Sequence, residues 1–281
     1  MRWRMGDRSL ECGPPTLVMG VLNVTPDSFS DGGRFLDHEA AVAHGVAMAE
    51  DGAAIIDVGG ESTRPGSDAV TVEQELSRVL PVIKRLAAEV ANVDVPISID
   101  TRKPEVARAA LDAGAVLVND VSGAREPGML EVVAASGAGL VLMHMLGEPK
   151  TMQVEPRYED VVREVRAYLA ERLGAAEAAG IERDRLAVDP GLGFGKTYEH
   201  NLELMRDIEG FLDLGVPVVV GPSRKSFIGT ALGDAPIEER LEGTIGAAAW
   251  MAGRGAHVVR VHDVAPVVRA LRLVNAIRGH R

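Results

Sequence analysis

Apolar runs and amphipathic stretches alternate along the chain from about residue 15 to its end. The apolar runs are rich in Val, Ile and Leu, which is typical of a parallel sheet covered on both faces. We expect strands over residues 16–24, 54–60, 96–100, 116–121, 140–145, 186–189, 216–220 and 258–261. Between them the helical spacing of apolar positions predicts helices over residues 38–51, 73–90, 104–112, 128–135, 158–179, 201–214, 238–251 and 266–277.

This alternation is the pattern of repeated βα units. Eight such units in roughly 250 residues is typical of a (β/α)8 barrel, the TIM-barrel architecture. A doubly wound open sheet is the structural alternative, but eight successive units that close with a helix favour the barrel. We expect residues 1–14 to form a short N-terminal arm or hairpin and residues 15–281 to form a single barrel domain.

Composition narrows the class of protein. The chain is 46% hydrophobic and 25% charged, which is ordinary for a globular protein with a full core. Its net charge of −11 disfavours bulk attraction to nucleic acid or to anionic membranes. The single cysteine, Cys12, excludes an intramolecular disulfide, and the charged N-terminus lacks the apolar segment of a secretory signal. We therefore expect a cytoplasmic protein.

Polar residues stand where each predicted strand ends. They are Asn23, Glu61, Asp100, Asn119, His144, Asp189, residues 223–225 and residues 260–263. Any one of them alone could be a helix cap or a satisfied buried polar group. Because active sites of such barrels lie at the carboxyl ends of the strands, the complete set indicates a site there.

Two groups within this set suggest ligands. Arg260 and His262 share one face of the last strand, and a cation pair in the barrel mouth suits an anion such as phosphate. The alternative is an ion pair between the arginine and a carboxylate of a neighbouring strand. Asp100, Asn119 and Asp189 offer acceptors and an amide that match a flat heterocycle with several N–H donors.

Two further segments leave their chemistry open. The glycine-rich residues 189–196 lack the spacing of a nucleotide-binding P-loop, and their glycines would let backbone or Phe194 approach a planar ligand. Lys225 fits either a Schiff-base nucleophile or a donor to a carbonyl group. His144 is better explained as a supporting residue than as a catalytic one.

Seven strings together resemble one family, the dihydropteroate synthases of bacterial folate synthesis. They are MGVLNVTPDSFSDGG (19–33), DVGGESTRPG (57–66), SIDT (98–101), NDV (119–121), DPGLGFGK (189–196), SRKSFIG (223–229) and RVHDV (260–264). The strings occur in the family's order from about residue 15 to the C-terminus. Pro222 departs from the small or branched residue that is more frequent there.

The resemblance implies a fold and a reaction. The family is a (β/α)8 barrel and usually a homodimer. It is a transferase that joins 6-hydroxymethyl-7,8-dihydropterin diphosphate to 4-aminobenzoate, giving 7,8-dihydropteroate and pyrophosphate. An SN1-like path without a covalent enzyme intermediate fits this chemistry, so Lys225 becomes a donor rather than a nucleophile. Sulfonamides would compete with aminobenzoate.

The resemblance also implies roles for residues of this chain. Asp100, Lys225 and Arg260 would be the catalytic residues. The pterin would be held by Asp100, Asn119, Asp189, Lys225, Met143, Phe194 and Gly221. The diphosphate would be held by Arg64, Arg260, His262 and Asn23, with Asn23 as a ligand of Mg²⁺. Aminobenzoate would contact Thr63, Pro65, Phe29 and Ser223, with the loops after the first two strands acting as a lid.

Three rival functions can be distinguished from this one. A pterin-binding barrel of the folate–corrinoid methyltransferase type should lack the cationic diphosphate site and the aminobenzoate loops. A non-catalytic pterin-binding paralogue should lack some site residues, and none of the expected ones is missing here. A Schiff-base aldolase barrel would form a borohydride-trappable adduct on Lys225.

Overall fold

The computed structural model describes residues 1–25, 33–62, 67, 69–90, 93–148 and 150–280, and of residues 33–37 the backbone alone. Eight parallel strands lie in the order β8-β7-β6-β5-β4-β3-β10-β9. A parallel bridge between Val188 and Val218 joins the two ends of this series. The strands are β3 (Leu17–Asn23), β4 (Ile55–Gly59), β5 (Ile97–Asp100), β6 (Leu117–Asp120), β7 (Gly139–Met143), β8 (Leu186–Asp189), β9 (Val219–Val220) and β10 (Val258–Val261). The predicted (β/α)8 barrel is confirmed.

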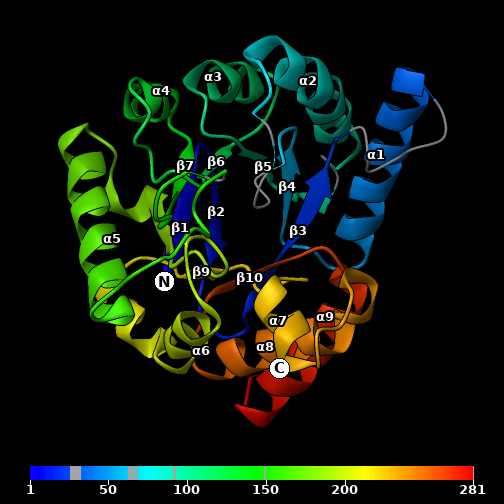
Figure 1. Cartoon of the computed structure of the whole chain (residues 1–281). Coiled ribbons are helices and arrows are strands. Elements are labelled where there is room, and N and C mark those ends of the chain that lie inside the picture. Colours follow the sequence, from blue (N-terminus) through cyan, green and yellow to red (C-terminus); the bar gives the residue numbers. More distant parts are fainter. Residues whose placement is uncertain (26–32, 63–66, 68, 91–92, 149, 281) are drawn as a thin grey trace.

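Helices surround the strands on the outside of the barrel, from α1 round to α9 (Figure 1). They are α1 (Gly33–Glu50), α2 (Val72–Glu89), α3 (Pro104–Asp112), α4 (Met129–Ser136), α5 (Val161–Ala178), α6 (Tyr198–Arg206), α7 (Ser226–Ala231), α8 (Leu241–Gly253) and α9 (Val264–Ile277). Outward-facing strand residues such as Leu22, Val58 and Val259 form one core with the helices. No helix in the described ranges is long and apolar enough to cross a membrane.

The N-terminal residues form the predicted hairpin, with β1 (Arg2–Met5) antiparallel to β2 (Arg8–Glu11). Trp3 and Met5 are fully buried and join a second core with inward-facing strand residues such as Met19 and Leu117. The Trp3 Nε1–H group donates to the Arg185 carbonyl at 3.2 Å. The hairpin therefore closes the amino-terminal end of the barrel. The division into an arm of residues 1–14 and a domain of residues 15–281 stays a prediction.

Two helical elements differ from expectation. The predicted helix over residues 201–214 is wrong, because α6 ends at Arg206 and a 3₁₀ helix, Ile208–Leu214, follows. Gly210 inside this segment is a poor helix former, and its N–H bonds to the Asp207 carbonyl at 3.0 Å. The six-residue helix α7 was not predicted, because it is too short to show a helical period.

Candidate functional site

Charged and amide side chains fill the carboxyl end of the barrel, where the sequence places the site. Side chains alternate along each strand, so Asp57, Asp100, Asn119 and Arg260 point inward while their neighbours Val58, Ile99, Val118 and Val259 belong to the outer core. These four inward residues come from β4, β5, β6 and β10. All but Arg260 are nearly or fully buried.

Arg260 is the centre of this inner cluster. Its Nε–H donates to Asp57 Oδ2 at 2.6 Å and its Nη2–H donates to Asp100 Oδ2 at 2.6 Å. The Asn119 amide donates to the same Asp57 oxygen at 2.8 Å. Arg260 is therefore ion-paired with carboxylates of other strands, which is the alternative that the sequence left open. Burial raises the pKa of Asp100, and the guanidinium only partly offsets that rise.

Asp57 is the residue that sequence reasoning missed. From the sequence it is named only as the first residue of the string 57–66, although a carboxylate inside the apolar run Ile-Ile-Asp-Val is itself a signal. It is fully buried, and its second oxygen, Oδ1, has no hydrogen-bond partner among the described residues. A buried carboxylate of this kind is tolerated only beside a cation, which is Arg260.

Asp189 ends β8 and begins the glycine-rich loop. Its Oδ1 accepts a hydrogen bond from the backbone N–H of Gly191 at 2.7 Å. Burial raises the pKa of Asp189, and the hydrogen bond from Gly191 only partly offsets this rise. Gly191 has a φ of +70°, and a Cβ there would lie 1.9 Å from the His144 carbonyl oxygen. Only glycine fits this position. A Cβ on Gly221 would lie 4.0 Å from Asp189 Oδ2, so this glycine lines the same space.

Polar side chains hold the backbone of the loop after Asp189. Gln153 donates to the Gly193 carbonyl at 2.7 Å, and Tyr158 donates to the Gly195 carbonyl at 2.8 Å. The loop presents Phe194, which packs in an apolar cluster with Met143. The ammonium group of Lys225 lies 3.9 Å from the centre of the Phe194 ring. The structure thus brings Met143, Phe194 and Lys225 to one side of the site.

Lys196 and His144 form a buried pair beneath this loop. Lys196 Nζ lies 2.9 Å from His144 Nδ1 and donates to the Phe194 carbonyl at 3.0 Å. The His144 ring stands edge-on to Tyr168, with 4.9 Å between ring centroids. Burial lowers the pKa of Lys196 to about 7 and that of His144 to about 2. The predicted supporting role of His144 agrees with these contacts.

Ser223 and His262 lie together on the neighbouring side, after β9 and β10. Ser223 Oγ is 2.9 Å from His262 Nδ1 and accepts the His262 backbone N–H at 3.2 Å. Beside them Arg224 makes two hydrogen bonds to Asp263, at 2.9 and 2.6 Å. Burial, followed by Arg260 and other nearby cations, lowers the pKa of His262 to about 3. The imidazole is therefore neutral at pH 7.

The amide of Asn23 faces the same mouth from β3. A Cβ placed on Gly59 would lie 3.7 Å from both Asn23 Oδ1 and Asp100 Oδ2, so these oxygens flank one glycine. Amide and carboxylate oxygens suit Mg²⁺, which needs few protein ligands when phosphates supply the rest. Within the described ranges no three His, Cys, Asp or Glu side chains gather into a metal cluster. The oxygens of Asn23 and Asp100 would suit a Mg²⁺ ion that takes most of its ligands from the phosphates of a substrate.

The remaining predicted residues divide into two groups. Phe29, Thr63, Arg64 and Pro65 lie outside the described residues. Glu61, at the end of the second strand unit, is paired with Lys103, which also bonds to the buried Glu75 at 2.6 Å. Its carboxylate is thus already matched by a cation.

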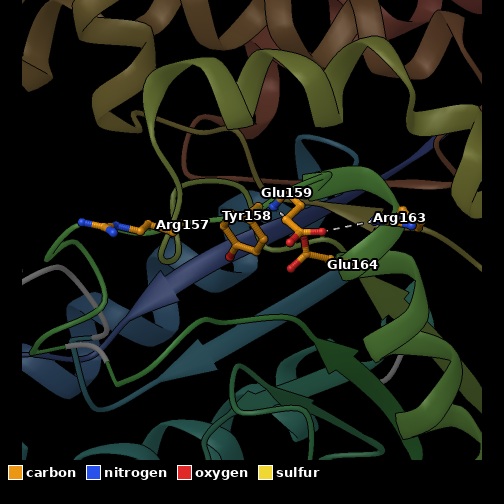
Figure 2. A pocket seen from close by; sticks show the side chains of 5 residues that line it. All are labelled: Arg157, Tyr158, Glu159, Arg163 and Glu164. Carbon is orange, nitrogen blue, oxygen red and sulfur yellow. Dashed lines mark hydrogen bonds and ion pairs between the residues drawn. The ribbon is translucent and has the colours of Figure 1, made fainter.

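A separate surface pocket of about 370 Å³ lies where α5 begins, lined by Arg157, Tyr158, Glu159, Arg163 and Glu164 (Figure 2). Figure 2 shows Arg157 extending away from the two glutamates, while Arg163 approaches Glu159 at 4.0 Å. Tyr158 connects this pocket to the loop at the barrel mouth, because its hydroxyl group donates to the Gly195 carbonyl. The pocket contains none of the inward-facing strand residues.

Comparisons with known proteins agree on one family. The pterin binding enzyme family matches residues 19–262. The dihydropteroate synthase of Escherichia coli strain K12 is 49% identical over 259 residues, which cover 92% of this chain and 90% of that protein. The dihydropteroate synthase of Mycobacterium leprae is 49% identical over 269 residues, with 93% of each chain covered.

Solved structures give the same result. The Xanthomonas albilineans dihydropteroate synthase with 4-aminobenzoic acid has a TM-score of 0.92 and 49% identity, with both chains fully covered. The same enzyme in complex with 7,8-dihydropteroate has a TM-score of 0.89 and 46% identity, again over all of both chains.

Proposed function

The chain belongs to the pterin binding enzyme family and, within it, to the dihydropteroate synthases. From this membership and its barrel mouth we propose that it joins 6-hydroxymethyl-7,8-dihydropterin diphosphate to 4-aminobenzoate. The products are 7,8-dihydropteroate and pyrophosphate. Related structures were solved with 4-aminobenzoic acid and with 7,8-dihydropteroate, which supports the same substrates here.

One observation carries the assignment: the inward polar set at the carboxyl ends of the strands. Asp100, Asn119 and Asp189 come from three strands and are all nearly buried. A pterin presents several N–H groups along one edge, and carboxylates and amides are their natural partners. Met143 and Phe194 offer an apolar surface for its rings, and Lys225 a donor for its carbonyl.

The diphosphate would lie on the side of Arg260 and His262. The hydrogen bonds of Arg260 within the described residues use two of its five N–H donors, so others can face an anion. Arg64 would contribute a second guanidinium. When bound, Mg²⁺ would neutralise part of the leaving group's charge, with Asn23 as its protein ligand.

The reaction path follows from where charge develops. Departure of pyrophosphate would leave an electron-poor carbon conjugated to the pterin, and the carboxylates of Asp100 and Asp189 would lie beside the pterin. These groups favour bond breaking before the amine attacks, an SN1-like path. The arylamine is neutral at pH 7 and attacks without a strong base. Phe29, Thr63, Pro65 and Ser223 would hold the aminobenzoate, and exclusion of water protects the cation.

Assembly and location are finer proposals. We propose a homodimer, supported by apolar side chains exposed on α8 and α9: Trp250 at 48%, Leu273 at 64% and Ile277 at 77%. Light scattering on the purified chain measures its mass directly, and a monomer would refute the dimer. A cytoplasmic location stays a prediction from the sequence.

An assay of pyrophosphate release tests the proposed reaction. The purified chain is mixed with the dihydropterin diphosphate, 4-aminobenzoate and Mg²⁺, and dihydropteroate is quantified alongside pyrophosphate. We expect equal amounts of both products and a loss of turnover when any component is omitted. Release of pyrophosphate that does not depend on aminobenzoate would argue against the reaction.

Sulfonamide competition tests the aminobenzoate pocket separately. A sulfonamide resembles 4-aminobenzoate in its aryl amine and its polar end, so we expect it to raise the KM for aminobenzoate and leave kcat unchanged. Initial rates over a grid of both concentrations measure this. Inhibition that is insensitive to aminobenzoate would contradict the pocket assignment.

A further inference from the structure

Ser223 and His262 are coupled by two contacts that share one oxygen. Ser223 Oγ accepts the backbone N–H of His262 at 3.2 Å and lies 2.9 Å from the Nδ1 atom of the same residue. Ser223 is only 5% exposed. Over the part of the chain that the structure describes, its hydroxyl group has no other hydrogen-bond partner.

A count of hydrogens decides the direction of the second contact. A backbone N–H can only donate, so Oγ is the acceptor in the first bond. If Nδ1 also carried a proton, Oγ would accept twice and its own buried hydrogen would have no acceptor. Such an unpaired buried donor is costly. The hydroxyl group therefore donates to Nδ1, and the ring proton lies on Nε2.

The charges around the ring agree with a neutral imidazole. Arg260, Arg224 and Lys225 all disfavour a second proton on His262, and Asp263 opposes them more weakly than any of the three. Asp263 is itself engaged by Arg224 through two hydrogen bonds. Burial acts in the same direction as the three cations.

We infer that Ser223 is a positioning residue that holds His262 as the neutral Nε2–H tautomer, so that the ring donates to the departing pyrophosphate. The contact between the ring and pyrophosphate rests on the proposed function. An Nε2 lone pair would be repelled by phosphate oxygens, whereas an Nε2–H group stabilises them. This role is separate from the aminobenzoate contact proposed for Ser223.

Nitrogen NMR of histidine-labelled protein tests the tautomer without any substrate. The His262 signals are assigned by their loss in His262→Gln. We expect a proton on Nε2 and none on Nδ1 in the wild type at pH 7.5 and in Ser223→Thr, which keeps the hydroxyl group. In Ser223→Ala we expect a substantial population with the proton on Nδ1. Ser98→Ala, which removes another buried serine hydroxyl, is the matched control and should leave the His262 signals unchanged.

Binding of pyrophosphate alone, measured by calorimetry, gives the second readout. Loss of one neutral donor should weaken binding in Ser223→Ala by about tenfold, with Ser223→Thr close to the wild type. A proton on Nδ1 in the wild type, or unchanged His262 signals in Ser223→Ala, would overturn the inference. If the NMR result holds but the protein makes no dihydropteroate, the proposed function fails and the tautomer assignment stands.

Discussion

Asp57 and Ser98 are neighbours in the register of β4 and β5, and both side chains point into the barrel. Asp57 holds Arg260 and Asn119, whereas the Ser98 hydroxyl group has no hydrogen-bond partner in the described structure. The two residues therefore occupy similar buried positions, but only the side chain of Asp57 holds other side chains in place. This difference can be measured.

Asp57→Ala should destabilise the fold, because it removes a fully buried carboxylate and leaves the partly exposed Arg260 with Asp100 as its remaining ion-pair partner among the described residues. Removing one partner of a buried ion pair lowers the free energy of unfolding by about 3 kcal/mol or more. Ser98→Ala removes a hydroxyl group without a partner and should leave the free energy near the wild-type value. Urea unfolding of both variants measures the difference, and equal effects would contradict the assigned role of Asp57.

Lys196 gives stability a dependence on pH. Burial lowers its pKa from 10.5 to about 7 in the folded chain, while the unfolded chain keeps the ordinary value. Between pH 7 and about 10 the unfolded chain thus binds more protons, so stability rises with pH in this window. Relative to Lys196→Met, which cannot titrate, the wild type should gain up to about 1.4 kcal/mol per pH unit.

Unfolding of the wild type and Lys196→Met at pH 7, 8 and 9 measures this gain. The comparison cancels the titration of all other groups that the two proteins share. A difference between them that stays constant with pH would show that Lys196 keeps its ordinary pKa in the folded chain.

Among the elements, the N-terminal hairpin covers the amino-terminal end of the barrel with the buried side chains of Trp3 and Met5. The sequence predicts that these residues form a hairpin or arm, but it cannot place them, because the partners of Trp3 are spread over the barrel strands. Helix boundaries show the same limit. The range of α3 is predicted in full because Pro104 opens it, whereas the end of α6 depends on local bonds that no periodicity reveals.

Trp3→Ala should leave a cavity at the amino-terminal end of the barrel core and lower the free energy of unfolding. Truncation of a fully buried tryptophan costs about 3–5 kcal/mol. Arg4→Ala, on the same strand, removes an exposed bidentate bond to Asp184 and should cost less than about 1 kcal/mol. Thermal and urea unfolding of both variants check this contrast. Similar losses would mean that the hairpin is not anchored through its buried face.

At the scale of the whole molecule, the barrel follows from the repeated alternation of apolar strands and amphipathic helices. The positions of Asp100, Asn119 and Asp189 also follow, since strand ends of a barrel meet at one mouth. The pairing of Arg260 with Asp57 and Asp100 does not follow. It depends on which inward side chains reach each other across the barrel, and 203 residues separate Arg260 from Asp57. The tautomer of His262 likewise needs the contact with Ser223.

The inward-facing polar residues are proposed to bind the pterin. Two aspartates at strand ends provide the test: Asp189 faces the barrel mouth, while Asp120 bonds to the backbone N–H groups of Ser122 and Ala124 at 2.7 and 3.1 Å. Each is replaced by asparagine, and kcat/KM for the dihydropterin diphosphate is measured. We predict a loss of about 100-fold for Asp189→Asn, since a charged hydrogen bond to the pterin disappears, and wild-type kcat/KM for Asp120→Asn. Wild-type kcat/KM in Asp189→Asn would contradict pterin binding by this residue.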